Sequence, residues 1–578
     1  MMKKFRFLMM AMAAIMLAGL ASCKDDVGNV DDGEEDNGTA KAYLSININV
    51  PNDNSGTKAD AEGDTNPMEE GTTDEFAIKN VTLYFFTEGS FTGTDYNYDG
   101  MYVQRLVVTG GFTGGVTTSP NVQYNSTTQT VSGLKADGTT VYHVYAIVNG
   151  STSIPVLNSA ITEEYFLENS VVTGLYATDG LVSASSLTAP GWTMASRNVT
   201  TPVSGKHGAY HTLTIPVTNS SGSPATAQLS VERIMGKLMI TAHANPIANE
   251  YDVKYETGGT PVKYATVAIT GTKVINTRND GYMFRHMTQI TTSAPVAVDP
   301  FFSGTDFNGF DKIGTAAYNV NKELTSATAD YVIDPQTKNK TKSSPLAPGY
   351  GSWYTAASPA FGASFTAMTT VTASATTLGY CLENTMHSTA QLNGYTTGVV
   401  FEAKVTPEEI VIYNGSGNNA PVAYNTGSPD NHPTTFYSYG NMFYGSIEAL
   451  EELGLVFNAN TTDAGFGTGG SAPTYSAADK ATAIKDLETN GVSILEGGIC
   501  YYKYWITHQP NDQHMAVMEY GIVRNNVYKM KVTGISGIGE SVEYILDPEE
   551  EDEHVKVYLD VQLDILPWIV RAQEDIIL

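Results

Sequence analysis

Near the N-terminus of this 578-residue chain lie the residues whose type and spacing could support chemistry. Basic side chains come first (Lys3, Lys4 and Arg6), and an apolar stretch follows from Phe7 to Leu20. This order is typical of a secretory signal. The residues before Cys23 fit the lipobox that signal peptidase II reads, so we expect the signal to span 1–22 and Cys23 to become a lipid-modified N-terminus. The alternative is an ordinary signal with an incidental cysteine.

A second chemical event that the sequence predicts is cleavage of the backbone by a protease. Residues 24–41 are acidic and rich in Gly and Asn, and residues 52–75 are polar and acidic, with Lys58 as the only basic residue. Exposed polar segments are preferred sites of proteolysis. The segment around Lys58 is therefore a candidate for proteolytic cleavage.

Other arrangements that could support catalysis are weak. His508 and His514 flank Pro510, and their spacing lacks the i, i+4 helical pattern of a zinc protease. The glycine-rich run Gly534–Gly539 is not followed by the Lys-Ser or Lys-Thr of a phosphate-binding loop, so a turn is the better interpretation. The run Glu549–Glu553 lacks the spacing of a calcium loop and is better read as a solvated linker. We expect no enzyme, metal or cofactor; a secreted hydrolase is the weakest hypothesis.

Composition narrows the function classes further. The formal net charge of −29 makes binding to nucleic acid phosphates unfavourable. The 54 Gly and 34 Tyr favour strands and turns over helix bundles. No apolar run after the signal is long enough to cross a membrane. Cys381 and Cys500 could pair, but two buried thiols are favoured. The four tryptophans could form a sugar platform, but core packing is favoured: Trp192, Trp353, Trp505 and Trp568.

One strand is predicted between the two acidic segments. From Ala42 to Val50 apolar and polar residues alternate strictly, and the apolar set is Ala42, Leu44, Ile46, Ile48 and Val50. A period of two over nine residues predicts a strand with one buried face. A core strand between two cleavable, solvated segments suggests a part of the fold that is meant to be removed.

The C-terminus mirrors this arrangement. A charged linker over Asp547–Glu553 precedes a second alternating run, whose apolar residues are Val555, Val557, Leu559, Val561, Leu563 and Ile565. We expect Pro567 and Trp568 to break this strand, and an apolar-tipped tail to follow from Ile569 to Leu578.

The remaining pattern predicts a mostly-β chain with a few short helices. Further strands are expected at 81–86, 141–149, 228–240, 399–405 and 498–506, and helices near 162–168, 447–453 and 477–489. Ser446 and Ser476 are N-cap candidates for the last two helices. We place a domain boundary near residue 225, which gives an N-terminal domain over 59–225 and a C-terminal domain over 226–578.

Several of these segments together resemble one family. They are the lipobox at Cys23, the strand Tyr43–Val50, the run Val144–Asn149, the run Gly521–Tyr528, and the strand Val557–Ile565 followed by Pro567 and Trp568. In this order and spacing the chain resembles Mfa-like fimbrillins, the shaft subunits of type V pili in Bacteroidales-type bacteria.

The resemblance implies two β-sandwich domains of transthyretin-like type and a structural role in a cell-surface fimbrium that supports adhesion. It implies export as an outer-membrane lipoprotein, trimming by a trypsin-like protease, and polymerisation with other copies or related fimbrillins. The removed strand would carry Leu44, Ile46, Ile48 and Val50. The donor strand of a neighbouring subunit would come from 555–578 and carry Val557, Leu559, Val561, Leu563, Ile565 and Trp568.

One feature departs from the family pattern. Many relatives are cut after an arginine, but between Cys23 and Glu75 this chain has none. Carried over to this chain, the best-placed cut lies between Lys58 and Ala59, and it would make residues 23–58 a propeptide. An Arg-specific protease would fail there, so the trypsin-like protease must accept lysine. The alternative function is a cell-surface glycan-binding lipoprotein, which would keep Cys23 and the strand 42–50 attached.

Overall fold

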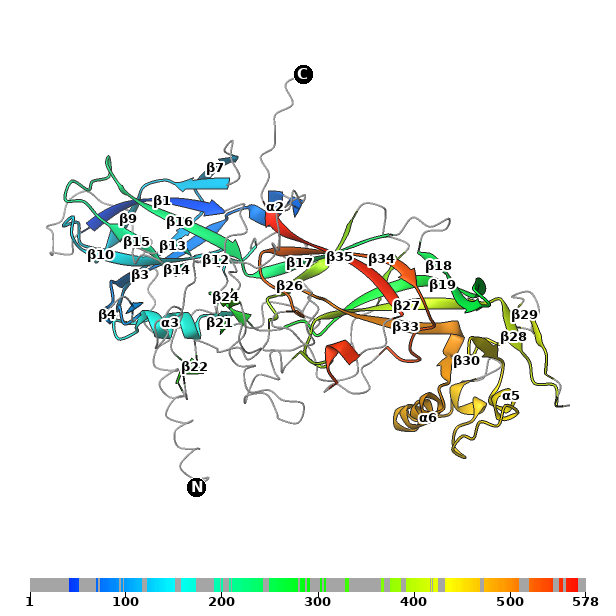
Figure 1. Ribbon diagram of the computed structural model, residues 1–578. Helices are drawn as coiled ribbons and strands as arrows, with labels where there is room; N and C mark the ends of the chain where they lie inside the picture. The colour runs from blue at the N-terminus through cyan, green and yellow to red at the C-terminus, as the bar shows by residue number, and fades with distance from the viewer. Residues whose placement is uncertain are drawn as a thin grey trace, which may run out of the picture. The chain divides into compact units, whose positions relative to one another are not determined.

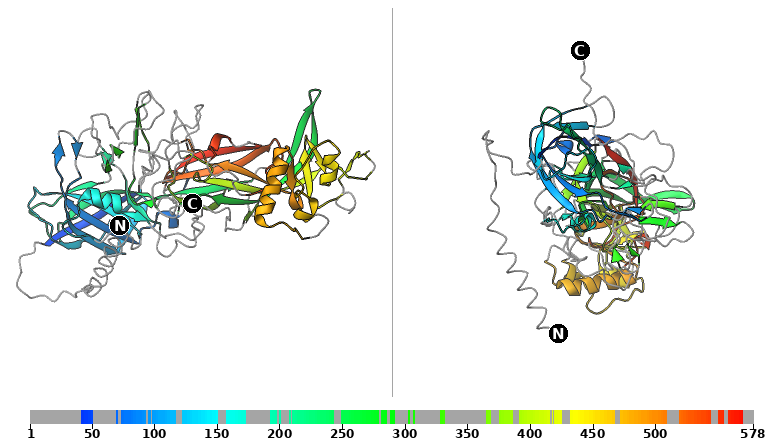
Figure 2. Two further views of the ribbon diagram at one scale, coloured as in Figure 1. Left: turned by 90° about the horizontal axis from the view of Figure 1, so that it is seen from below. Right: turned by 90° about the vertical axis from the view of Figure 1, so that its left-hand side faces the viewer.

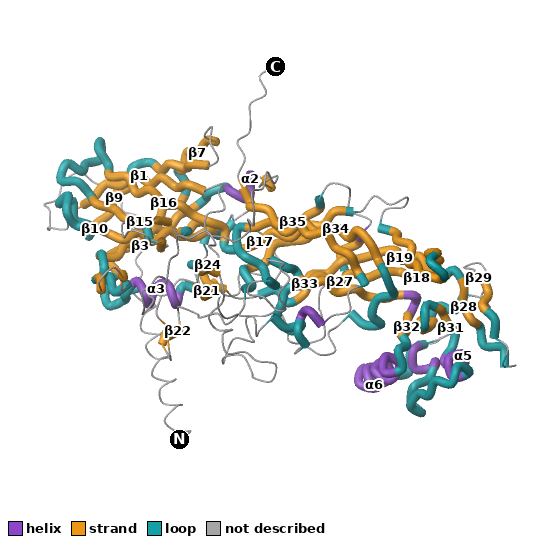
Figure 3. The backbone as a smooth tube through the Cα atoms, viewed as in Figure 1, coloured by secondary structure: helices purple, strands orange, loops and turns teal. Residues whose placement is uncertain are grey.

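The computed structural model consists mainly of β-strands in several sheets, with few helices among the described residues (Figure 3). It describes residues 41–578 except 51–68, 71–72, 93–94, 97, 117–121, 151–156, 173–191, 198, 201–206, 209, 243–248, 279–280, 286–287, 292–301, 304–305, 308–327, 332–364, 369–374, 386–390, 416, 418, 425–431, 468–471, 509–518, 544–549, 555–557 and 570–578. The mostly-β fold class expected from the sequence is confirmed.

The first sheet has the strand order β6-β3-β10-β12-β16-β1-β8-β7, with β15 beside β10 and β9 beside β1. Its strands are β1 (Lys41–Val50), β3 (Asn80–Thr87), β6 (Tyr102–Thr109), β7 (Phe112–Val116), β8 (Val122–Ser126), β9 (Gln129–Ser132), β10 (Val141–Val148), β12 (Met194–Ser196), β15 (His211–Thr214) and β16 (Ala225–Arg233). Apolar residues of β1, β3, β10 and β16 meet in one buried core. That arrangement is typical of a β-sandwich.

A second sheet has the order β2-β35-β34-β17-β26. It consists of β2 (Glu69–Glu70), β17 (Met235–Thr241), β26 (Thr376–Leu382), β34 (Asn526–Ile535) and β35 (Leu559–Ile569). A third sheet has the order β18-β19-β27-β33, with β25 beside β19. Its strands are β18 (Glu250–Thr257), β19 (Thr260–Ile275), β25 (Thr366–Ala367), β27 (Gly398–Pro407) and β33 (Ile499–Trp505). The inner faces of these two sheets share a second buried core.

The chain changes sheets at Ile234. β16 ends at Arg233 in the first sheet, and β17 begins at Met235 in the second. The run of β-formers expected over 228–240 is therefore two strands. The domain boundary near residue 225 stays a prediction, but the sheet pairing assigns all of β16 to the first sheet.

A smaller unit is inserted between the neighbouring strands β27 and β33. It contains β28 (Glu409–Val411), β29 (Pro421–Ala423), β30 (Phe436–Tyr439), β31 (Met442–Tyr444), β32 (Ser493–Leu495), α5 (Ile447–Glu451) and α6 (Ala477–Thr489). These elements have a buried core of their own. The side chains of Ser446 and Ser476 accept backbone N–H groups at the starts of α5 and α6, which confirms both predicted N-caps.

The remaining elements are short. The helices are α2 (Thr73–Phe76) and α3 (Glu163–Asn169), with 3-10 turns at Asp463–Phe466, Glu496–Gly498 and Asp552–His554. Two-stranded pairs join β4 (Phe91–Thr92) to β5 (Asp95–Tyr96), β11 (Val171–Val172) to β20 (Gly281–Tyr282), β13 (Val199–Thr200) to β14 (His207–Gly208), β21 (Thr288–Thr291) to β24 (Thr328–Tyr331), and β22 (Phe302–Ser303) to β23 (Asp306–Phe307). None of the described helices is long and apolar enough to cross a membrane.

Candidate functional site: the groove around β1

The strand β1 lies inside a sheet and is paired on both edges. On one edge it runs parallel to β16, from Leu44 opposite Ala225 to Asn49 opposite Ser230. On the other edge it runs antiparallel to β9 and then to β8. β1 therefore fills a slot between β16 and the β8–β9 segment, and Figure 1 shows it beside β16.

The inward face of β1 is fully buried. Ala42, Leu44, Ile46 and Ile48 have 0% exposed surface and Val50 has 1%. All five belong to the core of the first sheet, which confirms the face predicted from the alternating pattern. Burying apolar side chains of this size contributes roughly 1.5–3 kcal/mol each before ordering costs. Removing β1 would thus leave a strip of apolar pockets and two unpaired strand edges.

The chain after β1 is anchored at α2 by polar contacts to side chains outside β1. The Glu75 carboxylate is 2% exposed and lies 3.0 Å from Lys237 Nζ, and the Tyr380 hydroxyl donates to it at 2.5 Å. Burial raises the pKa of Tyr380, so its hydroxyl stays protonated and can donate. Arg233 Nε donates to the Glu75 carbonyl at 2.8 Å. α2 is therefore held by side chains from β16, β17 and β26.

Asn149, the last residue of the Val144–Asn149 run, fixes the chain directly after α2. Its side-chain Nδ2 donates to the carbonyls of Ala77 and Trp192 at 2.7 and 3.0 Å, and its Oδ1 accepts the backbone N–H of Lys79 at 2.8 Å. Asn149 has a φ of 52°, which asparagine tolerates better than most residues. A cut in the segment 51–68 would leave residues 73–80 in place by these contacts.

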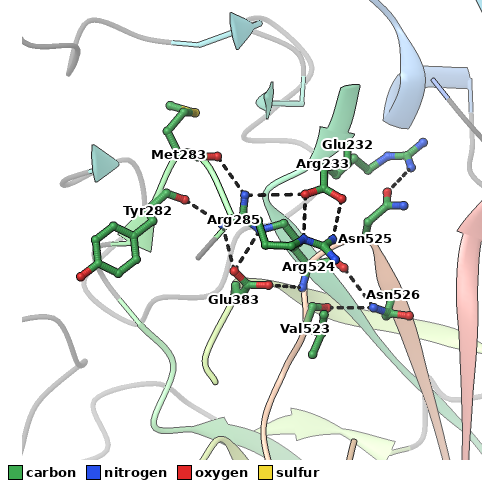
Figure 4. A network of polar contacts seen from close by, with 10 residues as sticks. All are labelled: Glu232, Arg233, Tyr282, Met283, Arg285, Glu383, Val523, Arg524, Asn525 and Asn526. Atoms are coloured by element: carbon green, nitrogen blue, oxygen red, sulfur yellow. Dashed lines mark hydrogen bonds and ion pairs between the residues drawn. The ribbon is translucent and has the colours of Figure 1, made fainter. Parts of the chain in front are cut away.

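A network of polar contacts surrounds Arg524, within the Gly521–Tyr528 run (Figure 4). Arg524 Nε donates to Glu383 Oε2 at 2.9 Å, and its Nη1 and Nη2 donate to the carbonyls of Met283 and Tyr282 at 2.8 and 2.9 Å. The side chain is 1% exposed, so these bonds compensate a buried charge. The network fixes the segment that leads into β34.

The same network holds the end of β16 (Figure 4). Arg285 makes a bidentate pair with Glu232, with Nε to Oε1 at 3.0 Å and Nη2 to Oε2 at 2.5 Å. Arg233 Nη1 donates to Asn525 Oδ1 at 3.1 Å. Burial lowers the pKa of Arg233 to about 10, so it stays charged at neutral pH. Sequence reasoning missed these arginines, although a charged residue inside a run of β-formers was a signal for a buried pair.

The second predicted site element, β35, is paired in the chain's own second sheet. It runs antiparallel to β34, from Leu559 opposite Ile535 to Pro567 opposite Asn526. Figure 2 shows β35 in red beside β34 in orange. Leu559 is buried, whereas Val561, Leu563 and Ile565 pack on the core but are only partly buried. Asp560, Gln562 and Asp564 on the outer face are exposed.

The expectation that Pro567 and Trp568 break this strand is wrong, because β35 continues to Ile569. Beyond β34, the neighbour of β35 among the described strands is β2, which pairs only with Trp568 and Ile569. Proline cannot donate to a ladder and is tolerated in strands at such edges.

Several predicted site residues lie outside the described residues, namely the signal 1–22, Cys23, Lys58, Ala59, Val555 and Val557. For Trp568 the backbone is described and the side chain is not. Lipidation, cleavage and strand donation at these positions therefore stay predictions.

Where they are described, the side chains of the cysteines, histidines and tryptophans considered for other chemistry are buried in the interior of the fold. Cys381 and Cys500 are free, buried thiols, as favoured from the sequence. His508 is 3% exposed, and its Nδ1 lies 2.8 Å from the Tyr528 hydroxyl. Trp192 and Trp505 are 1% and 4% exposed, so both pack in the interior. Among the described residues, no group of three or more His, Cys, Asp or Glu could hold a metal ion.

Comparison with known proteins gives one family match. Residues 494–574 match the model "Major fimbrial subunit protein type IV, Fimbrillin, C-terminal". This segment includes β33, β34 and β35, and the match confirms the family resemblance over its length. No curated protein matches.

Three solved structures that match this chain show low similarity to it. A fimbrilin from Porphyromonas gingivalis W83 is 12% identical, with 92% of this chain and 99% of that chain covered and a TM-score of 0.33. The tip fimbrial protein Mfa3 from Porphyromonas gingivalis is 10% identical, with coverage of 92% and 100% and a TM-score of 0.30. A fimbrial assembly protein from Parabacteroides distasonis ATCC 8503 is 14% identical, with coverage of 52% and 79% and a TM-score of 0.23.

Proposed function

We propose that this chain, whose residues 494–574 match the fimbrillin C-terminal family model, is a structural fimbrial subunit that polymerises by strand exchange. It is exported as a lipoprotein through Cys23, reaches the outer membrane, and is cut after Lys58 by a trypsin-like protease at the cell surface. The cut detaches β1, and a C-terminal strand of a neighbouring copy or related fimbrillin takes its place. The filament supports adhesion.

The observation that carries this proposal is the position of β1. It is a strand with a fully buried inward face and partners on both edges, yet its sequence link to the rest of the chain is the polar segment that contains Lys58. After a cut there, β1 is held by non-covalent contacts only. Its departure exposes pockets and backbone groups that an added strand can satisfy, which is the principle of β-augmentation.

The region 555–578 has the properties of a donor. The inward residues Val561, Leu563 and Ile565 of β35 are only partly buried in their own sheet, whereas the equivalent face of β1 has at most 1% exposure. Moving such a strand from an edge into the β1 groove increases the burial of its apolar face, which offsets part of the cost of leaving β34. A head-to-tail contact of this kind is heterologous and generates an open filament.

Limited digestion of the purified full-length protein with trypsin tests the proposal. We expect a new N-terminus at Ala59, followed by ladders of multimers in SDS gels of unboiled samples. Lys58→Gln should abolish both the cut and the ladders. The matched control is Lys41→Gln, at the exposed start of β1, which should leave both unchanged. If Lys58→Gln forms ladders as readily as the unchanged protein, release of β1 by this cut is wrong.

A surface glycan-binding lipoprotein is the alternative function. The buried positions of Trp192 and Trp505 remove two of its four candidate platform residues. This function would retain β1, so the N-terminal sequence of the mature protein isolated from cells separates the two functions.

A further inference from the structure

The hydrogen-bond ladder along β1 has a gap on the β16 edge, and a side chain closes it. Backbone pairing with β16 starts only at Leu44. At the preceding residue, the Tyr43 N–H donates to Asn219 Oδ1 at 2.7 Å, and Asn219 Nδ2 donates to the Tyr43 carbonyl at 2.8 Å. Asn219 thus hydrogen-bonds to both the N–H and the carbonyl of Tyr43, as a residue of a neighbouring strand would.

A second gap lies on the opposite edge, between the end of β8 at Ser126 and the start of β9 at Gln129. There the Ile46 N–H donates to Ser126 Oγ at 3.0 Å. Ser126 Oγ in turn donates to the Thr127 carbonyl at 2.8 Å, which orients the hydroxyl oxygen as an acceptor. On each edge, therefore, a side chain binds the backbone of β1 where the flanking strands do not.

Both side chains belong to the groove and not to the strand that fills it. Asn219 sits in a turn in which its N–H donates to the Pro216 carbonyl at 2.9 Å, and Ser220 and Ser223 exchange backbone hydrogen bonds. Ser126 is the last residue of β8. Loss of β1 leaves Asn219 and Ser126 in the groove, with the groups that bound Tyr43 and Ile46 available to the next occupant.

We infer that Asn219 and Ser126 are positioning residues that bind the backbone of whichever strand occupies the groove and fix which of its residues face each edge; this rests on the proposed removal of β1. They contact backbone groups, so they act on any sequence. Consecutive residues of a strand turn their N–H and C=O to opposite edges. Asn219 and Ser126 lie on opposite edges and bind positions 43 and 46, so a shift by one residue breaks both contacts. The same shift would turn the apolar side chains away from the pockets.

The test uses full-length protein cut with trypsin and a fluorescent synthetic peptide of residues 41–50, the segment whose position in the groove is known. The cut N-terminal fragment is first removed under mildly denaturing conditions, and fluorescence anisotropy then gives the peptide's dissociation constant for the emptied groove. We expect Asn219→Ala to weaken binding roughly tenfold to a hundredfold, because two hydrogen bonds are lost. Asn219→Asp keeps an acceptor for the Tyr43 N–H but cannot donate to its carbonyl, so it should also weaken binding. The matched control is Thr218→Ala, at the exposed neighbouring residue, with no change expected.

A modified peptide shows whether Asn219 acts through the backbone of position 43. N-methylation of Tyr43 removes the N–H that Asn219 accepts. It should weaken binding to the unchanged protein and have a much smaller effect on Asn219→Ala, which is the signature of a direct contact. Equal affinity of the unchanged protein and Asn219→Ala for the unmodified peptide would overturn the inference while leaving strand exchange intact. Failure of the unchanged cut protein to release its fragment or bind any peptide would overturn the proposed function itself. Hydrogen exchange of the uncut variants, expected to match the unchanged protein in β3 and β10, excludes a general folding defect.

Discussion

Replacing Leu44 by alanine should destabilise the uncut chain and leave the assembled filament unaffected. Leu44 has 0% exposure and belongs to the core shared by β1, β3, β10 and β16. Leucine-to-alanine changes in cores cost about 2–5 kcal/mol, depending on how far the surroundings collapse into the cavity. Because β1 is paired on both edges, its backbone cannot shift to fill the space. We therefore expect a cost in the upper part of this range, about 3–4 kcal/mol.

Urea unfolding combined with hydrogen exchange measures this loss in the uncut protein. The chain has more than one core, so a single global transition is not assumed, and exchange in β16 and β8 reports the local opening free energy. The control is Ser45→Ala, on the other face of β1, for which we expect a change within about 0.5 kcal/mol.

The same variant is then cut and assembled. If the mature subunit has lost β1, filaments of Leu44→Ala should resist urea as well as filaments of the unchanged protein do, because the altered residue is no longer present. Persistence of the deficit in filaments would mean that β1 stays in the mature subunit and would refute strand exchange. An undiminished stability of the uncut variant would refute the assignment of Leu44 to a tightly packed core.

Three further measurements address the rest of the fold. Glu75→Gln leaves the buried Lys237 ammonium without its carboxylate and should cost about 3–5 kcal/mol of stability in thermal unfolding. Adding Lys237→Met should restore most of the lost stability, and equal losses for the single and double variants would contradict a buried ion pair between Glu75 and Lys237. Burial raises the pKa of Asp463 to about 6 from an unfolded value of about 3.9, so its stabilising contribution is complete below pH 4 and is lost as the pH rises through 6. In urea unfolding from pH 4 to 7, the free energy of unfolding of the inserted unit should therefore fall with pH, and it should fall less in Asp463→Asn. Burial raises the pKa of the Cys381 and Cys500 thiols to about 12, so maleimide should label them at pH 8 only after denaturation, and labelling of the native protein would contradict their burial.

The sequence alone was sufficient for features that depend on local periodicity and local capping. The alternating residues from Ala42 to Val50 identified a strand and its buried face, because successive side chains of a strand point to opposite sides. Helix α6 begins where Ser476 predicted, because the serine side chain accepts a first-turn N–H group, and Gly491, at a φ of 73°, follows its end.

Only the tertiary structure decided which strands border β1 and which side chains complete its ladder. β16 lies far along the chain and runs parallel to β1, and nothing in the alternation of either strand specifies the partner or its direction. Asn219 stands in a segment that sequence reasoning treats only as a turn, yet it binds both backbone groups of Tyr43. Periodicity records which face of a strand is buried, whereas edge partners are set by contacts between residues far apart in sequence, which no local pattern encodes.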